Sequence, residues 1–232
     1  MFKIIKLKSV LMAVLLIVSS ILCSVGIVAV VESKNVPKSI YTIVLDAGHG
    51  GRDDGCTGVS GVKEQDINLK ITKTLKVYLE TLGIKVVLTR ADGNGLYDTN
   101  ATNFKTSDMA KRMDIIRGSK ADMVISIHCN SYKDKKQSGA QVFYQEDDTV
   151  SQELANIMQS QLKSQLEGAR SESNHGDYFL LKESSMPAVL IECGYLSNER
   201  EEKLLNSVTY QNKIAYSIMC GVVAYFGLCG ND

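Results

Sequence analysis

The chain has 232 residues, enough for one domain with a proper apolar core but too few for two domains of ordinary size plus a tail. Lys and Arg together number 26, as do Asp and Glu, so the chain carries no net formal charge. Because a nucleic-acid partner is usually met by a basic surface, this balance argues against nucleic-acid binding.

A hydrophobic leader occupies residues 1–31. Three lysines near the start precede an apolar run over residues 9–31, which is closer in length to a membrane-spanning helix of about 20 residues than to a signal-peptide core. Small residues at 24–26 nevertheless offer a cleavage site. The leader is therefore either a signal peptide or a membrane anchor. In both cases the basic start keeps the N-terminus inside and directs the rest of the chain out of the cytoplasm.

A polar connector over residues 32–40 joins the leader to a predicted catalytic domain over residues 41–232. In the first half of this domain, nearly continuous apolar runs predict strands over 41–47, 85–90 and 123–127. Apolar residues at helical spacing predict helices over 65–82 and 107–118, and a Ser107-Asp108 pair is expected to cap the second of these.

The second half continues the alternation of strands and helices. Strands are expected over 139–144, 178–181 and 188–191, helices over 150–166 and 199–226, and a polar loop over 167–176. Together the two halves predict an α/β fold, with a single domain built on a twisted, mainly parallel sheet flanked by helices.

Residues suited to metal chemistry stand where predicted strands end. Two of the three histidines in the chain, His49 and His128, lie where a strand meets a loop, and Glu192 ends a third strand. Ligands of open α/β sheets bind outside the carboxyl ends of the strands, so these side chains are expected at one edge. Glu64 begins the helix after a Gly-rich loop. A carboxylate there is favoured by the helix dipole, but it can also point back across the same crevice.

Four motifs resemble the zinc-dependent N-acetylmuramoyl-L-alanine amidases. They are residues 45–51 (LDAGHGG), Glu64 with Asn68, residues 126–130 (SIHCN) and residues 187–198 (PAVLIECGYLSN). The match runs in order from about residue 42 to residue 226.

This resemblance implies that His49, Glu64 and His128 bind Zn²⁺ and that Glu192 is the catalytic carboxylate. Two His and one Glu form a known catalytic zinc set with an open fourth position. The resemblance also implies a substrate, peptidoglycan, cut at the amide between N-acetylmuramic acid and the L-alanine of the stem peptide. The enzyme would act outside the cytoplasm, exported or anchored in the membrane through residues 9–31, facing the cell wall or spore cortex.

The format of the chain indicates a biological role. We expect neither the helical insert that regulated family members often carry after the strand at 139–144 nor a wall-binding repeat. Control would then come from the anchor, from the timing of synthesis or from a regulatory or targeting protein partner. The small format resembles the germination-specific amidases, which implies a role in spore-cortex maturation through muramic lactam formation.

Several other residues have two interpretations. Asp46 and Asp66 are candidates for holding the histidines from behind, as zinc ligands usually require. Asn130 either orients substrate or shapes its turn, and His175 is either solvated or lines the substrate groove. Arg112 resembles a recurrent family arginine and is expected to tie the fold together.

The six cysteines show no short, even spacing, and Cys129 and Cys193 stand inside apolar runs. We therefore expect mostly free, buried thiols.

Two rival functions stay open at this level. One is another zinc-dependent hydrolase of wall peptides, such as a carboxypeptidase or a deacetylase, because a metal and a base alone do not select the amide. The other is a non-catalytic wall-binding scaffold that keeps the fold. Analysis of reaction products separates all three.

Overall fold

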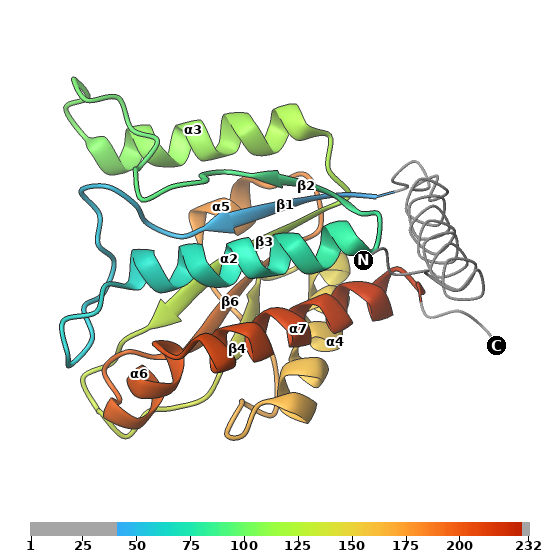
Figure 1. The fold of residues 1–232 in the computed structure, drawn as a ribbon. Coiled ribbons are helices and arrows are strands. Elements are labelled where there is room, and N and C mark those ends of the chain that lie inside the picture. The colour runs from blue at the N-terminus through green and yellow to red at the C-terminus, as the bar shows by residue number, and fades with distance from the viewer. Residues whose placement is uncertain (1–40, 229–232) are drawn as a thin grey trace, which may run out of the picture. The chain divides into compact units, whose positions relative to one another are not determined.

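A computed structural model of the protein describes residues 41–228, and these residues contain a six-stranded sheet with the strand order β2-β1-β3-β6-β4-β5 (Figure 1). The predicted leader at 1–31 and connector at 32–40 lie outside the described residues, as does the end of the predicted domain after residue 228. The strands are β1 (Thr42–Ala47), β2 (Lys85–Leu88), β3 (Met123–Asn130), β4 (Gln141–Tyr144), β5 (Asn174–His175) and β6 (Ala188–Tyr195).

The centre of the sheet is parallel. β1 pairs with β2 and β3, and β3 pairs with β6, all in parallel register. On the far side β4 runs antiparallel to β6, and the short β5 is parallel to β4. The sheet is therefore mixed but mainly parallel, which confirms the predicted α/β class and places the carboxyl ends of β1, β3 and β6 at one edge, here called the carboxyl edge.

Helices cover both faces of the sheet. They are α2 (Glu64–Thr81), α3 (Phe104–Ser119), α4 (Thr149–Gln165), α5 (Phe179–Glu183), α6 (Glu199–Leu205) and α7 (Val208–Tyr225). The larger apolar core joins α2, α4 and α7 to one face, here the α2/α7 face, and the smaller core joins α3 and α5 to the other, the α3/α5 face. Within residues 41–228 no helix is both long and apolar enough to cross a bilayer.

Alternation along the strands decides which residue meets which face. In β1, β3 and β6, the residues Leu45, Ile125 and Ile191 belong to the larger core, whereas Val44, Val124 and Leu190 belong to the smaller one. Because successive side chains of a strand point to opposite faces, His128 lies on the same face as Val124, and Glu192 on the same face as Leu190. The side chains of His128 and Glu192 therefore both lie on the α3/α5 face.

Two predicted elements are wrong in type or extent. Residues 178–181 were expected as a strand, but Phe179–Glu183 is the helix α5. The Lys182 N–H donates to the Tyr178 carbonyl at 3.0 Å, as in a helix, and Leu180 and Leu181 form its buried face. The predicted helix over 199–226 is two helices, because Ser207 caps α7 by accepting a hydrogen bond from the Tyr210 N–H at 3.2 Å.

Smaller differences concern element ends. The predicted polar loop at 167–176 contains β5. The helix α3 begins three residues before the expected Ser107-Asp108 cap, and its cap is Asn103, whose side chain accepts a hydrogen bond from the Thr106 N–H. Ser107 instead accepts a hydrogen bond from the Asp98 N–H, and Asp108 binds Leu96 and Arg112. These two side chains therefore fasten the preceding loop to α3.

The four cysteines among residues 41–228 are free thiols. Cys129 and Cys193 are buried, as expected from their apolar surroundings, and Cys56 and Cys220 are partly exposed. Cys23 and Cys229 lie outside the described residues. The expectation of free thiols is confirmed for the part of the chain that the structure describes.

Candidate metal centre

The carboxyl edge brings together three segments that are far apart in sequence. His128 in β3 is the direct neighbour of Glu192 in β6, and the Gly48 N–H after β1 donates to the Ile127 carbonyl at 3.0 Å. His49 follows with a left-handed backbone, φ 63°. Both histidines and Glu192 therefore meet at this edge, as the strand pattern predicts.

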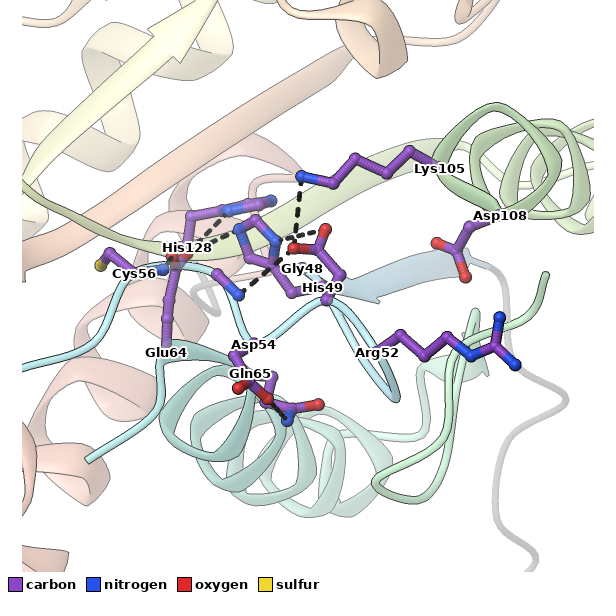
Figure 2. Close-up of polar contacts among 12 residues, drawn as sticks. Gly48, His49, Arg52, Asp54, Cys56, Glu64, Gln65, Lys105, Asp108 and His128 are labelled. Atoms are coloured by element: carbon purple, nitrogen blue, oxygen red, sulfur yellow. Dashed lines mark hydrogen bonds and ion pairs between the residues drawn. The ribbon is translucent and has the colours of Figure 1, made fainter. Parts of the chain in front are cut away.

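A cluster of His49, Glu64 and His128 forms at this edge, and its potential ligand atoms all lie within 4.8 Å of one another (Figure 2). The Glu64 Oε1 atom is 3.2 Å from His49 Nε2 and 3.0 Å from His128 Nδ1. Zinc bonds of roughly 2.0–2.2 Å in a tetrahedron place ligand atoms about 3.3 Å apart. The donor set and the two distances from Glu64 therefore fit a zinc ion, which these three residues would hold.

Glu64 is held in place by its surroundings. As the first residue of α2 it accepts hydrogen bonds at Oε2 from the Cys56 N–H at 2.8 Å, and at Oε1 from the Cys129 N–H at 3.1 Å and the Asn68 amide at 3.2 Å. Burial by itself would raise the pKa of Glu64, but the hydrogen bonds and charges of His128 and His49 outweigh it and hold this pKa well below the usual range. Glu64 is thus an ionised carboxylate, the form in which it can bind a metal.

The His49 ring is oriented by a carboxylate that the sequence analysis missed. His49 Nδ1 lies 2.9 Å from Asp53 Oδ2, which leaves Nε2 turned toward Glu64. Burial would lower the pKa of His49, but Glu64 and Asp53 raise it to about 9. A carboxylate behind a histidine is typical of zinc ligands. The two proposed candidates for this role do not fill it, because Asp66 is exposed and Asp46 is engaged elsewhere.

Two buried arginines hold the backbone that carries His49. Arg90 donates to the carbonyl oxygens of Ala47 at 2.8 Å and Gly48 at 2.9 Å. Arg112 donates to those of Ala47 at 2.8 Å and His49 at 2.5 Å. The left-handed conformation of His49 is unfavourable for a non-glycine residue, so it depends on such contacts. Arg112 therefore ties the fold together as expected, whereas the role of Arg90 was not predicted.

Asp46 completes this support from within the sheet. Its carboxylate pairs with Arg112 Nη1 at 2.6 Å and accepts hydrogen bonds from Ser126 at 2.6 Å and Thr89 at 2.7 Å. Burial would raise the pKa of Asp46, but Arg112 and the two hydroxyl groups lower it to about 2. The network links β1, β3, α3 and the residue that follows β2, and three of its members line the same cavity as His49 and His128.

Glu192 has a different environment from Glu64. It is 8% exposed, and its Oε2 atom is buried without a hydrogen-bond partner among residues 41–228. Burial raises the pKa of Glu192 to about 7, opposed by His128 and His49 and reinforced by the Glu64 carboxylate. A buried carboxylate whose pKa is close to neutral is suited to take up and release protons.

Two glycines make room for the cluster. A Cβ atom at Gly48 would lie 2.2 Å from His128 Cε1, and one at Gly55 would lie 2.4 Å from Glu64 Oε2. Gly55 also has a positive φ of 71°, which a side chain would strain. Both positions therefore require glycine for the ring and the carboxylate to occupy their places.

The remaining sequence candidates lie outside the cluster. Asn130 Oδ1 accepts a hydrogen bond from the Ser131 N–H at 2.7 Å, so its side chain shapes the turn. The His175 side chain is 55% exposed, with Glu146 as a distant ionic neighbour at 4.0 Å. Neither residue contacts the three predicted ligands in the described structure.

Residues 43–224 match the N-acetylmuramoyl-L-alanine amidase family. The germination-specific N-acetylmuramoyl-L-alanine amidase of Bacillus subtilis is 35% identical over 197 residues, covering 83% of this chain and 82% of the relative.

Two solved structures have the same fold. The CwlD amidase of Clostridioides difficile, determined in complex with the GerS lipoprotein, is 40% identical with a TM-score of 0.78, covering 81% of this chain and 99% of that chain. The catalytic domain of CwlV from Bacillus (Paenibacillus) polymyxa is 30% identical with a TM-score of 0.72, covering 81% and 99%. The chain belongs to the N-acetylmuramoyl-L-alanine amidase family.

Proposed function

We propose that this protein is a zinc-dependent amidase that cleaves the bond between N-acetylmuramic acid and the L-alanine of the peptidoglycan stem peptide. In this proposal His49, Glu64 and His128 hold the zinc and Glu192 is the general base. The observation that carries it is the cluster of two histidines and an ionised carboxylate beside a buried, unpartnered carboxylate. Family membership supplies the bond that is cut.

The chain's own residues account for the steps of hydrolysis. A bound zinc ion polarises a carbonyl group and lowers the pKa of water toward about 7. Glu192 accepts a proton from the attacking water and then delivers it to the nitrogen of the leaving alanine. Asp53 keeps the His49 ring in one orientation, and the hydrogen bonds to Glu64 keep its carboxylate fixed during turnover.

The biological setting is proposed from the relatives. The germination-specific function of the Bacillus subtilis relative supports a role in spore-cortex maturation linked to germination. The complex of the Clostridioides difficile amidase with a lipoprotein supports a protein partner for this chain as well. We place the catalytic domain, over residues 41–232, outside the cytoplasm, because its substrate lies there and the sequence of residues 1–31 is that of a signal peptide or anchor.

Product analysis tests the bond. Purified protein, kept in mild detergent because of its leader, is incubated with purified peptidoglycan and zinc, and the products are analysed by mass spectrometry. We expect free stem peptides that begin with alanine and glycan strands that have lost them. Release of terminal D-alanine would indicate a carboxypeptidase, loss of acetyl groups a deacetylase, and binding without any product a scaffold.

A further inference from the structure

A cavity of about 220 Å³ lies beside the cluster of His49, Glu64 and His128, on the α3/α5 face. His49 and His128 line it on the side of the cluster. Phe104 and Met109 of α3 line another side, and Phe179 of α5 and Leu190 of β6 contribute further apolar surface. A compartment therefore adjoins the proposed zinc ligands directly. Most of its surface is apolar, and its lining also includes Asp53, paired with Lys105, and Asp108, paired with Arg112.

The polar groups at the base of this cavity are already engaged. Asp46, Ser126 and Arg112 line it, but Asp46 takes hydrogen bonds from both of the others at 2.6 Å. A polar ligand group would have to compete with this buried network. The base therefore favours an aliphatic group, which needs no hydrogen bond.

One cation stands among the lining residues with most of its side chain in solvent. Lys105, in the first turn of α3, is 63% exposed, and its Nζ lies 3.5 Å from Asp53 Oδ1. Figure 2 shows Lys105 extending from α3 toward the side of the cluster that carries His49. An ammonium group has three donors, so the ion pair with Asp53 leaves donors for a ligand. An apolar cavity with a cation beside it suits an aliphatic group that carries a carboxylate.

The substrate has two sides, and only one fits this compartment. This step rests on the proposed function. On the acyl side of the scissile amide, muramic acid belongs to a sugar polymer that continues in both directions, so it needs an open groove. On the amine side, the stem peptide is a short branch with aliphatic side chains and free carboxylates. A cavity with a floor can receive the branch but cannot receive the polymer.

The position of the proposed base agrees with this assignment. Leu190 lines the cavity, and Glu192 follows it on the same face of β6. Glu192 must deliver a proton to the leaving nitrogen, which belongs to the peptide. A stem peptide bound in the cavity would therefore have its leaving nitrogen on the same face of the sheet as the Glu192 side chain.

We propose that this cavity, the stem-peptide pocket formed by Phe104, Lys105, Met109, Phe179 and Leu190, binds the first residues of the stem peptide and that Lys105 binds the free α-carboxylate of the glutamate at the second position. The pocket would thereby contribute to selecting substrates by their peptide. It would also explain an exposed aromatic side chain at Phe179, which is 50% accessible.

The experiment compares two muropeptides that differ in one group. Both carry L-alanine followed by D-glutamate, with the glutamate α-carboxylate free in one and amidated in the other. We expect the protein to cleave the free acid with a kcat/KM at least five-fold higher, and Lys105→Ala to reduce this ratio to about one. Lys111→Ala, an exposed lysine in the same helix, is the matched control and should keep the ratio. Zinc content is measured in each variant, because Lys105 also contacts Asp53.

A second variant tests the apolar part of the pocket. Phe179→Ala should raise KM several-fold for both muropeptides with kcat little changed, whereas Tyr216→Ala, an equally exposed aromatic residue in α7, should leave KM unchanged. An unaltered KM in Phe179→Ala, or an acid-to-amide ratio that survives in Lys105→Ala, would overturn the pocket while leaving the amidase function intact. Failure of the unmodified protein to cleave either muropeptide would overturn both.

Discussion

On the α2/α7 face, β1, β3 and β6 contribute apolar side chains to the larger core, and Leu45, Ile125 and Ile191 among them are completely buried. On the α3/α5 face, the same three strands change character along their length. Val44 and Val124 come first, Asp46 and Ser126 follow, and His128 and Glu192 stand near the carboxyl edge. One set of strands thus builds a uniform core on one side and, on the other, a core that becomes a polar network and then a reactive site.

This difference separates two kinds of stability. The α2/α7 face depends mainly on close packing of apolar side chains. The α3/α5 face depends on the pair of Asp46 and Arg112, and Arg112 also donates to the carbonyl groups of Ala47 and His49. A change within the apolar core of the first face, away from Glu64 at the start of α2, should alter folding alone, whereas a change of Asp46 or Arg112 should also alter the metal site.

The largest effect is expected from Glu192→Gln. The amide is nearly isosteric but cannot accept the proton, so kcat should fall about 10²–10⁴-fold, the usual contribution of a general acid–base group. Zinc content, measured by atomic absorption, should equal that of the unmodified protein, because Glu192 is not one of the three proposed ligands. Substantial residual activity in this variant would reject the assigned role.

Arg112→Leu should be the most damaging change in the supporting network. It leaves the buried Asp46 carboxylate without its ionic partner, and breaking a buried pair in this way costs about 3–5 kcal/mol. It also releases the carbonyl oxygen of His49, so zinc affinity should fall as well. Chemical denaturation and zinc titration measure the two effects, and a loss of stability with unchanged zinc affinity would contradict the proposed coupling.

Leu75→Ala provides the matched change on the α2/α7 face. Leu75 is fully buried in α2, and truncating such a side chain costs about 2–5 kcal/mol of unfolding free energy. Below its lowered melting temperature the variant should bind zinc and cleave substrate as the unmodified protein does. If zinc affinity falls as much as in Arg112→Leu, packing on the α2/α7 face supports the metal site as strongly as the Asp46–Arg112 network does.

The smallest effect concerns acid stability. The pKa of Asp46 is about 2 in the folded protein against an ordinary value of 3.8, so its contribution is fully present above about pH 4 and is lost as the pH falls toward 2. The shift corresponds to roughly 2 kcal/mol. Asp46→Asn should be less stable than the unmodified protein at pH 6, and the gap should narrow toward pH 2. A gap that does not change with pH would show that Asp46 acts by packing alone.

The sequence pattern predicted the candidate site best at positions where an apolar strand ends in a polar residue. It predicted His49, His128 and Glu192 at one edge because parallel strands end at the same edge of a sheet. Glu64 depended on the family motif, since a carboxylate at a helix start has an ordinary structural explanation. These four positions required no knowledge of side-chain contacts.

Contacts between distant residues were beyond reach. Arg90 and Arg112 act on carbonyl groups some 40 and 65 positions away in sequence, and no local pattern encodes that. Asp53 left one weak signal, its position four residues after His49 in a Gly-rich turn. The apolar run at 178–181 was misassigned because short runs fit a buried strand and a buried helix equally well.

Removing and restoring the metal shows whether hydrolysis by this protein needs zinc. Protein stripped of metal by a chelator is titrated with zinc while release of stem peptides from peptidoglycan is followed by mass spectrometry. We predict no activity without metal, a rise that ends at one zinc per chain, and neither zinc binding nor activity at that ratio in His128→Ala. Full activity in the metal-free protein, or stoichiometric zinc binding that survives in His128→Ala, would contradict the account.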